Sequence, residues 1–292
     1  MKKLTFADLH LRATVPSCVN ATPSEWMEIQ EKALEKIVEI CEKNDVDEVY
    51  VGGDIFHSEQ ATSFECVILF QNFCRKLESL GIKVFILAGN HDLPGHSTAN
   101  VRRSAIGVLF NSVAVNSMNS ADSKIKGSNF DEESDLDFPY IFKHVLCIPE
   151  EIKPALAECE TPQTLLEKFP KAKIIFTGDY HKNFIYKSPD GRMVVNSGCL
   201  TKQASDFEGY ETGVYATDLE KGDVIWFTVN VPQKFVKNGG KGNRDKSLED
   251  FVNSIKKESV TLDFISELRE RVPAQKEPVQ EKVESWIEKI GQ

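Results

Sequence analysis

Short apolar runs alternate with long amphipathic segments over residues 1–90, and this alternation constrains the fold more than any other feature. The runs have the length and the apolar content of buried strands, and they lie at residues 4–7, 48–53 and 83–90. Helical spacing of apolar residues predicts helices between them, from about Ser24 to Lys43 and from about Thr62 to Leu80. Buried strands separated by helices are typical of parallel βαβ units, in which ligands gather where the strands end.

The pattern changes beyond Val115. Residues 117–137 are polar, acidic and without periodicity, which predicts a loop. Further strands are predicted at 144–149, 173–176, 183–187, 192–196, 213–219 and 224–231. The sequence Ser188-Pro189-Asp190-Gly191 predicts a hairpin turn, because Pro and Gly fit its central positions. We therefore expect an α/β fold in which a second, mostly antiparallel sheet faces the first.

Composition predicts a domain boundary near residue 232. Residues 1–231 form the predicted main domain, and 232–246 are a basic, Gly-rich linker. Residues 247–292 are predicted to be helical and are too few to make a secure core alone. The basic side chains of the linker could meet phosphates, but a charged linker is more often simply solvated.

Cysteine usage, apolar stretches and charge narrow the class of protein. The 7 cysteines include no Cys-x-x-Cys pair, which predicts reduced and mostly buried thiols. No apolar stretch reaches the length of a membrane span and the first residues do not resemble a signal peptide, so we expect a cytoplasmic protein. A net charge of −10 argues against bulk coating of nucleic acid, but it allows local binding through metals and a basic patch.

Acidic, amide and imidazole side chains follow each of the first three predicted strands. They occur as Asp8-Leu9-His10, Gly53-Asp54 and Gly89-Asn90-His91-Asp92. Each motif by itself is more often a hydrogen-bonded turn or a helix cap than a ligand set. In an extended chain, residues two apart such as Asp8 and His10 point to the same side. Because parallel strands end at one edge of a sheet, the coincidence of these motifs predicts a metal site there.

Together with Gly178-Asp179-Tyr180-His181, these motifs stand in the order of the calcineurin-like metallophosphoesterase signature, and the chain resembles that family. More narrowly, it resembles the SbcD-type nuclease subunits of DNA repair and recombination and their phage-encoded relatives. The segments that carry this likeness are GDIFHS (53–58), LAGNHD (87–92) and VNSGCLTKQASDFEGYETGVY (195–215). The resemblance covers residues 1–231 and implies a four-layer sandwich of two facing mixed β-sheets flanked by helices. A small helical appendage would follow.

The resemblance also implies two metal sites. The first would be held by Asp8, His10, Asp54 and His181. The second would be held by Asp54 as a bridge, Asn90 and Asp179, which replaces the first histidine of the family's Gly-His-x-His motif. The lone histidine that the family carries upstream is not evident, because the nearest candidate, His144, stands at the start of the predicted strand at 144–149, too early for a ligand. We therefore expect weak occupancy of an oxygen-rich second site, which suits Mn²⁺ or Mg²⁺ better than Zn²⁺.

By the same resemblance, the reaction is metal-assisted hydrolysis of a phosphoester by in-line displacement. His91 would protonate the leaving oxygen, and Asp92 would fix the orientation of His91. His57 follows the Asp-x-Phe segment of the family and would approach the substrate, although a hydrogen-bonded turn histidine explains it equally well.

The leading hypothesis is an Mn²⁺-dependent DNA nuclease subunit, an exo- or endodeoxyribonuclease that works with an SbcC-type ATPase and that could form a homodimer. The first alternative is a small-molecule phosphodiesterase or phosphatase on the same scaffold, because fold does not determine substrate. The second is a catalytically weakened scaffold that binds DNA, which the departures in the second metal site favour.

Overall fold

The structure is a computed structural model that describes residues 1–236 except for gaps at 59–61, 113, 131, 133–136, 154–158, 205–206 and 208. The chain divides into two compact units, Met1–Val236 and Lys237–Gln292, and the described residues all belong to the first. Most of the predicted linker and the whole predicted helical segment at 247–292 lie outside the described residues. The boundary near residue 232 stays a prediction.

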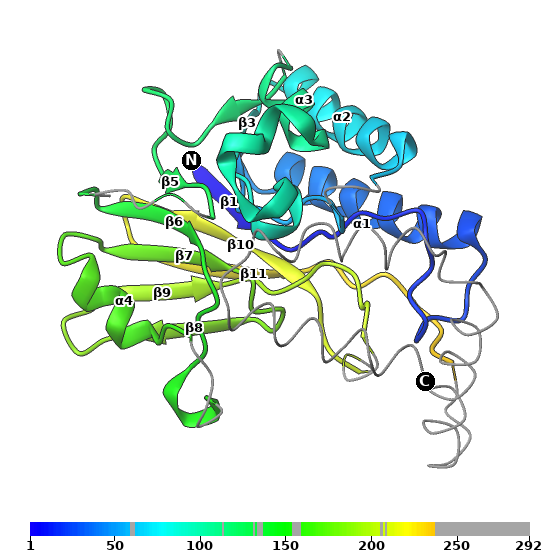
Figure 1. The fold of residues 1–292 in the computed structure, drawn as a ribbon. Helices are drawn as coiled ribbons and strands as arrows, with labels where there is room; N and C mark the ends of the chain where they lie inside the picture. The colour runs from blue at the N-terminus through cyan, green and yellow to red at the C-terminus, as the bar shows by residue number, and fades with distance from the viewer. Residues whose placement is uncertain are drawn as a thin grey trace, which may run out of the picture. The chain divides into compact units, whose positions relative to one another are not determined.

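The first sheet contains the strands predicted for the amino-terminal part of the chain (Figure 1). Its order is β11-β10-β1-β2-β3-β4, with β1 to β4 parallel, β10 antiparallel to β1, and β11 antiparallel to β10. The strands are β1 (Lys2–Phe6), β2 (Val46–Val51), β3 (Lys83–Ile86), β4 (Asn116–Ser117), β10 (Gly213–Asp218) and β11 (Asp223–Thr228). The strand and helix alternation therefore predicted β1, β2 and β3 correctly, whereas β4 was not predicted.

Helices α1 (Pro23–Lys43) and α2 (Phe64–Ser79) connect the first three strands. α1 begins at the predicted place because Thr22 and Glu25 form a capping box and Pro23 lies in the first turn, where it needs no N–H partner. The buried face of α1 carries one polar side chain that matters for the site, Gln30, next to Trp26.

The second sheet has the order β5-β6-β7-β9-β8. Its strands are β5 (Lys126–Ser128), β6 (Tyr140–His144), β7 (Ile174–Gly178), β8 (Phe184–Lys187) and β9 (Met193–Asn196). Neighbouring strands are parallel except for β8 and β9. The prediction of a mostly antiparallel second sheet is therefore wrong, and the predicted strands at 213–219 and 224–231 belong to the first sheet as β10 and β11.

The predicted hairpin between β8 and β9 is confirmed. The Gly191 N–H donates to the Ser188 carbonyl at 2.9 Å, and Gly191 has a φ of 87°, which a residue with a side chain rarely adopts. The hairpin predicts antiparallel pairing for the two strands that it joins, and the prediction extended that pairing to the whole sheet. The pairing does not extend further, because β9 also lies beside β7 and is parallel to it.

Short helical segments complete the described part of the chain. They are the α-helices α3 (Ala105–Phe110) and α4 (Pro162–Lys168) and the 3₁₀ helices η1 (Asn90–Asp92), η2 (Pro94–His96), η3 (Thr98–Arg103) and η4 (Glu150–Ile152). Strand β5 lies within residues 117–137, so that segment is not entirely the loop that was predicted.

Apolar side chains pack the two sheets and their helices into four layers. Along β2, Tyr50 faces the second sheet, where it packs with Phe142, whereas Val49 belongs to the cluster under α1 and α2. On the far side of the second sheet, Leu165 of α4 packs with Ile175. The order of layers is thus helices, sheet, sheet and helix, which is the predicted fold class (Figure 1).

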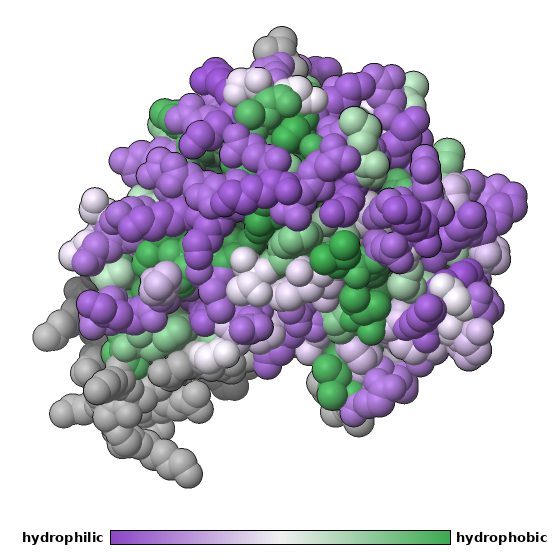
Figure 2. All heavy atoms as spheres, turned by 180° about the vertical axis from the view of Figure 1, so that it is seen from behind, coloured by the Kyte–Doolittle hydropathy of each residue, from purple (hydrophilic) through white to green (hydrophobic). Residues whose placement is uncertain are grey.

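Hydrophilic side chains cover most of the face seen in Figure 2, and hydrophobic side chains form smaller patches between them. In the described residues, no helix combines the length and the apolar character needed to cross a membrane.

Candidate metal centre

Strands from both sheets end at one edge, and the polar motifs follow them. The first sheet contributes the residues after β1, β2 and β3, while His144 ends β6 and His181 follows β7 in the second sheet. The Nε2 atoms of His10 and His181 are 3.0 Å apart, and His144 Nε2 is 3.4 Å from Asp54 Oδ1. The two sheets therefore bring the predicted ligands Asp8, His10, Asp54, Asn90 and His181 into one cluster.

The backbone at this cluster is strained. The angle φ is 55° at Asp8, 45° at His10, 50° at Asp54 and 77° at Asp179. A positive φ at a residue other than glycine is uncommon and costs about 1–3 kcal/mol when the surroundings impose it. Such outliers cluster at functional sites. They also correct the prediction of an extended chain: β1 ends at Phe6, and Asp8 and His10 converge through left-handed conformations instead.

The first candidate ligand group consists of Asp8, His10 and His181, whose ligand atoms lie within 4.8 Å of one another. His10 Nε2 is 3.0 Å from His181 Nε2 and 3.6 Å from Asp54 Oδ2. At metal–nitrogen distances of about 2.0–2.1 Å, ligands in adjacent positions around one cation lie about 3 Å apart. These side chains therefore have the spacing of ligands that share a cation.

The second candidate group consists of Asp8, Asp54 and His144. The Nδ1 atom of His144 donates to the Gly52 carbonyl at 2.7 Å, which fixes the ring with Nε2 3.0 Å from Asn90 Oδ1 and 3.4 Å from Asp54 Oδ1. Asp54 lies between the two groups, since Oδ2 approaches His10 and Oδ1 approaches His144.

His144 is the residue that sequence reasoning missed. The apolar run HVLCIP placed a strand at 144–149, so the histidine was read as preceding the strand. The strand is β6 (Tyr140–His144), and His144 therefore stands at its carboxyl end, where ligands gather. The expectation that the second site lacks a histidine is corrected. Its occupancy stays a prediction.

Asp179 contributes to the cluster through its backbone. Its N–H donates to both carboxylate oxygens of Asp8, at 2.9 and 3.1 Å. Among the residues that the structure describes, no candidate ligand group includes the Asp179 side chain. Its role as a ligand in place of histidine stays a prediction, while its amide clearly positions Asp8.

Unpaired buried atoms test whether these residues fit a cation. Asp54 Oδ2 is buried and has no hydrogen-bond partner among the described residues, which costs free energy unless a positive group satisfies it. Burial holds the pKa of His10 well below its usual value, so the imidazole is neutral and has a lone pair to give. Burial also raises the pKa of the Asp8 carboxyl to about 6. A divalent cation would satisfy the carboxylate oxygen and use the neutral imidazole, so the residues fit a metal centre.

The Asp54 carboxylate favours the protonated form of His144. Burial by itself would lower the pKa of His144, but the Asp54 carboxylate outweighs it and raises that pKa to about 10. The pKa of Asp54 is lowered, because His144 and His10 outweigh the effect of burial. Protonation of His144 and coordination of a cation beside Asp54 are therefore alternatives.

His91 is held by the backbone and not by Asp92. Its Nδ1 lies 2.8 Å from the His57 carbonyl, which can only accept, so Nδ1 carries a proton and Nε2 remains available for proton transfer. The Asp92 carboxylate accepts instead from the N–H groups of Gly89, Ile55 and Phe56, at 3.0, 3.2 and 2.9 Å. The predicted orientation of His91 by Asp92 is therefore wrong. Asp92 ties the loop after β2 to the loop after β3.

Gly89 permits this close approach of the two loops. A Cβ atom at Gly89 would lie 2.2 Å from Asp54 Oδ1 and 2.5 Å from Asp54 N. The carboxylate could not keep its place beside such a side chain.

A pocket of about 170 Å³ opens beside the imidazoles. Besides His10, His91 and His181, its lining includes residues that the sequence analysis did not single out, among them Arg12, Thr201, Gln203 and Phe207. Thr201, Gln203 and Phe207 lie in the segment at 195–215 that carries the family resemblance, but that resemblance does not indicate which of its side chains reach the site. Arg12 had no signal apart from its place two residues after His10.

His57 lies in the wall of this pocket, where it was predicted to approach the substrate. It also forms a third converging group with His10 and His91. Its Nε2 is 2.9 Å from Arg12 Nη1, which can only donate, so that nitrogen is occupied. Burial and then Arg12 lower the pKa of His57 to about 4, which leaves the ring neutral.

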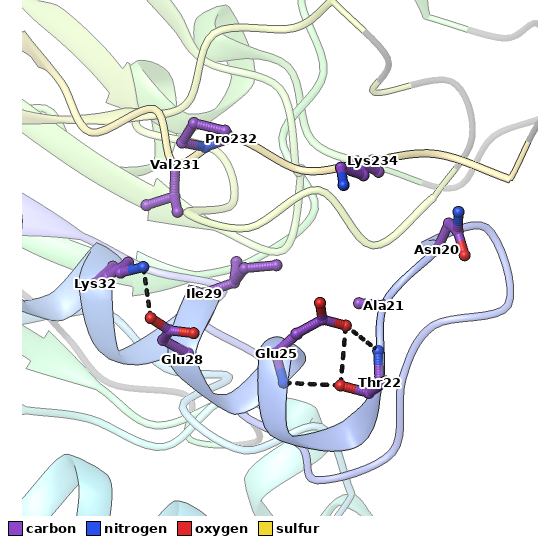
Figure 3. Close-up of a pocket in the computed structure, with 10 residues that line it drawn as sticks. All are labelled: Asn20, Ala21, Thr22, Glu25, Glu28, Ile29, Lys32, Val231, Pro232 and Lys234. Carbon is purple, nitrogen blue, oxygen red and sulfur yellow. Dashed lines mark hydrogen bonds and ion pairs between the residues drawn. The ribbon is translucent and has the colours of Figure 1, made fainter.

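A larger cavity of about 490 Å³ lies between the start of α1 and residues 231–234 (Figure 3). Two of its charged side chains form an ion pair, Lys32 and Glu28 at 2.6 Å, and Glu25 accepts from Thr22. Among the described residues that line it, none is a histidine or a cysteine. The metal-ligating chemistry therefore belongs to the smaller pocket.

Fold and site together define the class of a metal-dependent α/β phosphoesterase. The model of the calcineurin-like phosphoesterase family, Metallophos, matches residues 1–183 of the 292, and the chain belongs to this family. The matched region includes every candidate ligand from Asp8 to His181.

Solved structures of several phosphoesterases resemble this chain. A dimetal phosphatase from Danio rerio is 10% identical, with 81% of this chain and 98% of that chain covered and a TM-score of 0.49. The nuclease MPE from Pseudomonas putida is 13% identical, with 77% and 87% covered and a TM-score of 0.32. Yfce, a phosphoesterase from E. coli, is 14% identical, with 79% and 100% covered and a TM-score of 0.36.

Proposed function

We propose that this chain is an Mn²⁺-dependent DNA nuclease subunit that hydrolyses phosphodiester bonds in repair or recombination. One observation carries the proposal: the segments with SbcD-type resemblance, which are far apart in the sequence, line one pocket. His57 comes from the segment at 53–58, His91 from the segment at 87–92, and Thr201, Gln203 and Phe207 from the segment at 195–215.

The chemistry of the pocket supports phosphoester hydrolysis. When bound, divalent cations supply Lewis-acid activation of water and of the phosphoryl group. Asp54 lies between both ligand groups, and the oxygens of Asp8, Asp54 and Asn90 are the part of the ligand set that suits Mn²⁺. His91 lines the pocket, and because Nδ1 is bonded to the His57 carbonyl, its Nε2 can take up a second proton and give that proton to the leaving oxygen.

Pocket size and the ligand inventory favour this function over its alternatives. Sites that enclose a small molecule have volumes of about 300–1,000 Å³, whereas this pocket measures about 170 Å³. It suits a phosphoryl group whose attached chain continues outside. Two departures in the second site favoured the weakened scaffold, and His144 supplies one of them, the missing upstream histidine. Asp179 in place of the family's histidine remains as the other departure.

A cleavage assay tests the proposal. Purified protein is incubated with single- or double-stranded DNA, or with bis(p-nitrophenyl) phosphate, in Mn²⁺, Mg²⁺ or EDTA. We expect DNA cleavage with Mn²⁺, slower cleavage with Mg²⁺ and none with EDTA. Asp54→Asn should lose cleavage by three or more orders of magnitude, roughly, because both ligand groups depend on it. The matched control is Asp122→Asn, which alters an exposed carboxylate.

Two other results would contradict the nuclease. Hydrolysis of the small diester without cleavage of either DNA would identify a small-molecule phosphodiesterase. Retained DNA binding without hydrolysis of any substrate in either metal would identify a scaffold.

We also propose that the chain works with an SbcC-type ATPase and forms a homodimer. The α2 helix supports the dimer, because Phe64 is 85% exposed and Ile68, one turn later, is 55% exposed. Large apolar side chains exposed together are typical of protein contacts. We expect light scattering at micromolar concentration to give a dimer, and Phe64→Ser with Ile68→Ser to give a monomer. A monomeric unmodified chain would contradict the homodimer.

A further inference from the structure

Arg12 is held in the wall of the pocket by its backbone. The Arg12 N–H donates to Gln30 Oε1 at 3.0 Å, and the Arg12 carbonyl accepts from Gln30 Nε2 at 2.9 Å and from Trp26 Nε1 at 3.0 Å. Gln30 is 1% exposed and Trp26 is fully buried. A glutamine on the buried face of a helix is costly unless both its polar ends are used, and here both ends bond the backbone of Arg12, while Nε2 also lies 3.4 Å from the Trp26 carbonyl. The packed face of α1 therefore determines where Arg12 lies.

The guanidinium of Arg12 is oriented but not neutralised. Its Nε donates to Thr14 Oγ1 at 3.0 Å, and its Nη1 donates to His57 Nε2 at 2.9 Å. In the part of the chain that the structure describes, no carboxylate forms an ion pair with Arg12. A guanidinium has five N–H donors, so the protein leaves several of them for another acceptor. In a chain with a net charge of −10, a half-buried arginine without a carboxylate partner is unexpected. An anionic ligand would supply the missing partner.

We propose that Arg12 binds the phosphate next to the scissile one in a nucleic-acid strand, and so makes the pocket select a strand over a lone phosphodiester. This inference rests on the proposed nuclease function. A planar guanidinium with free N–H groups matches the oxygens of a phosphate better than any other side chain does.

The order of contacts around Arg12 indicates that it meets the neighbouring phosphate and not the scissile one. The His91 N–H donates to Asp54 Oδ1, and the rings of His91 and His57 stack with centroids 5.7 Å apart. Arg12 contacts the far member of this pair, His57. Arg12 is therefore separated from the metal ligand Asp54 by two imidazoles, whereas the scissile phosphate must lie beside the cations. Successive phosphates of a strand are separated by a sugar, so a group set apart from the cations can meet the second phosphate and not the first.

The test compares substrates that differ by one phosphate. The substrates are a thymidine dinucleotide with a single internal phosphodiester, the same dinucleotide with an added 5′ or 3′ terminal phosphate, and bis(p-nitrophenyl) phosphate, all with Mn²⁺. We expect one of the phosphorylated dinucleotides to be preferred by the unmodified protein by about 10- to 100-fold in kcat/KM. Arg12→Ala should abolish this preference, and it should lower kcat/KM for the phosphorylated dinucleotide far more than for bis(p-nitrophenyl) phosphate. Arg12→Lys should keep part of the preference, because a charge without the planar fork remains.

Salt dependence supplies a second readout that a merely structural role would not change. For a single-stranded oligonucleotide, the slope of log kcat/KM against log salt should become shallower by about 0.7 in Arg12→Ala, since one phosphate contact is lost. The control is Arg75→Ala on the exposed side of α2, which should change neither the preference nor the slope.

Three results would overturn the assignment of Arg12. One is an unmodified protein without a preference for the second phosphate, and another is a preference that survives in Arg12→Ala. The third is an equal loss on every substrate, which would mean contact with the scissile phosphate or a structural role. An unmodified protein that hydrolyses bis(p-nitrophenyl) phosphate but no nucleotide substrate would instead show that the nuclease proposal itself fails, and the inference with it.

Discussion

Replacement of His144 by alanine should leave one bound Mn²⁺ per chain where the unmodified protein binds two, and should lower kcat for phosphodiester hydrolysis by roughly 10²–10³-fold. His144 Nε2 faces Asp54 and Asn90, and no other imidazole in the described residues joins the group of Asp8 and Asp54. Its loss therefore removes the only nitrogen ligand of that group. Metal content by elemental analysis after gel filtration, together with steady-state kinetics, measures both effects.

Asp179→Asn is the matched comparison for His144→Ala. The family resemblance implied the Asp179 carboxylate as a ligand of the second cation beside Asp54 and Asn90, whereas in the structure the Asp179 N–H donates to Asp8, and an asparagine keeps that N–H. We expect this variant to bind two Mn²⁺ and to lose little activity. If Asp179→Asn lost one cation while His144→Ala kept both, the ligand set read from the structure would be refuted and the one inferred from the sequence would stand.

A fold or stability defect in His144→Ala must be separated from the loss of a ligand. The ring also donates from Nδ1 to the Gly52 carbonyl, so alanine leaves that buried carbonyl without a donor. Thermal unfolding in EDTA reports the structural cost without bound cation, which includes both the lost donor to Gly52 and the lost contact between His144 and Asp54. Unfolding in Mn²⁺ adds the stabilisation from binding, which should be smaller in the variant than in the unmodified protein.

The sequence predicted Asp54 as a ligand but not His144, and the difference lies in how clearly each strand end appears in the sequence. Asp54 was found because β2 is an apolar run that ends at glycines, so the strand end is visible in the residues themselves. β6 was misplaced because its apolar residues are interrupted by Lys143, while the run from Val145 to Ile148 is more apolar but forms only an isolated bridge at Cys147. The apolar content of a segment indicates burial, but it does not show whether the segment pairs as a strand, because pairing depends on partners that are distant in the sequence.

Contacts across long sequence separations explain the remaining differences. Arg12 is positioned by Gln30 and His57, which are 18 and 45 residues away, and no local pattern relates them. The two left-handed residues after β1 are likewise imposed by the assembled site, since Asp8 N donates to the Gly53 carbonyl and His10 N to the Asp54 carbonyl. Residue types at strand ends thus predicted the chemistry of the cluster, while tertiary structure determined its geometry.

Replacement of His91 by glutamine should lower kcat by about 10²–10⁴-fold and leave the content of bound Mn²⁺ unchanged. His91 Nδ1 donates to the His57 carbonyl, and the amide of glutamine retains a donor while it lacks a group that can release a proton to the leaving oxygen. The loss should shrink for a substrate with a good leaving group such as p-nitrophenolate, because that oxygen needs little protonation.

The leaving-group comparison separates proton transfer from ligation. The ring of His91 converges with those of His10 and His57, so the experiment must also test whether His91 is a metal ligand. A ligand role predicts loss of a cation and an equal fall in rate for DNA and for bis(p-nitrophenyl) phosphate. A role as general acid predicts full metal content and a much larger fall in rate for DNA than for bis(p-nitrophenyl) phosphate. The sugar oxygen that leaves from DNA is strongly basic, so its departure depends on protonation. The backbone contacts of His91 favour the second outcome, because its N–H already donates to Asp54 Oδ1 and holds the ring beside the centre without coordination.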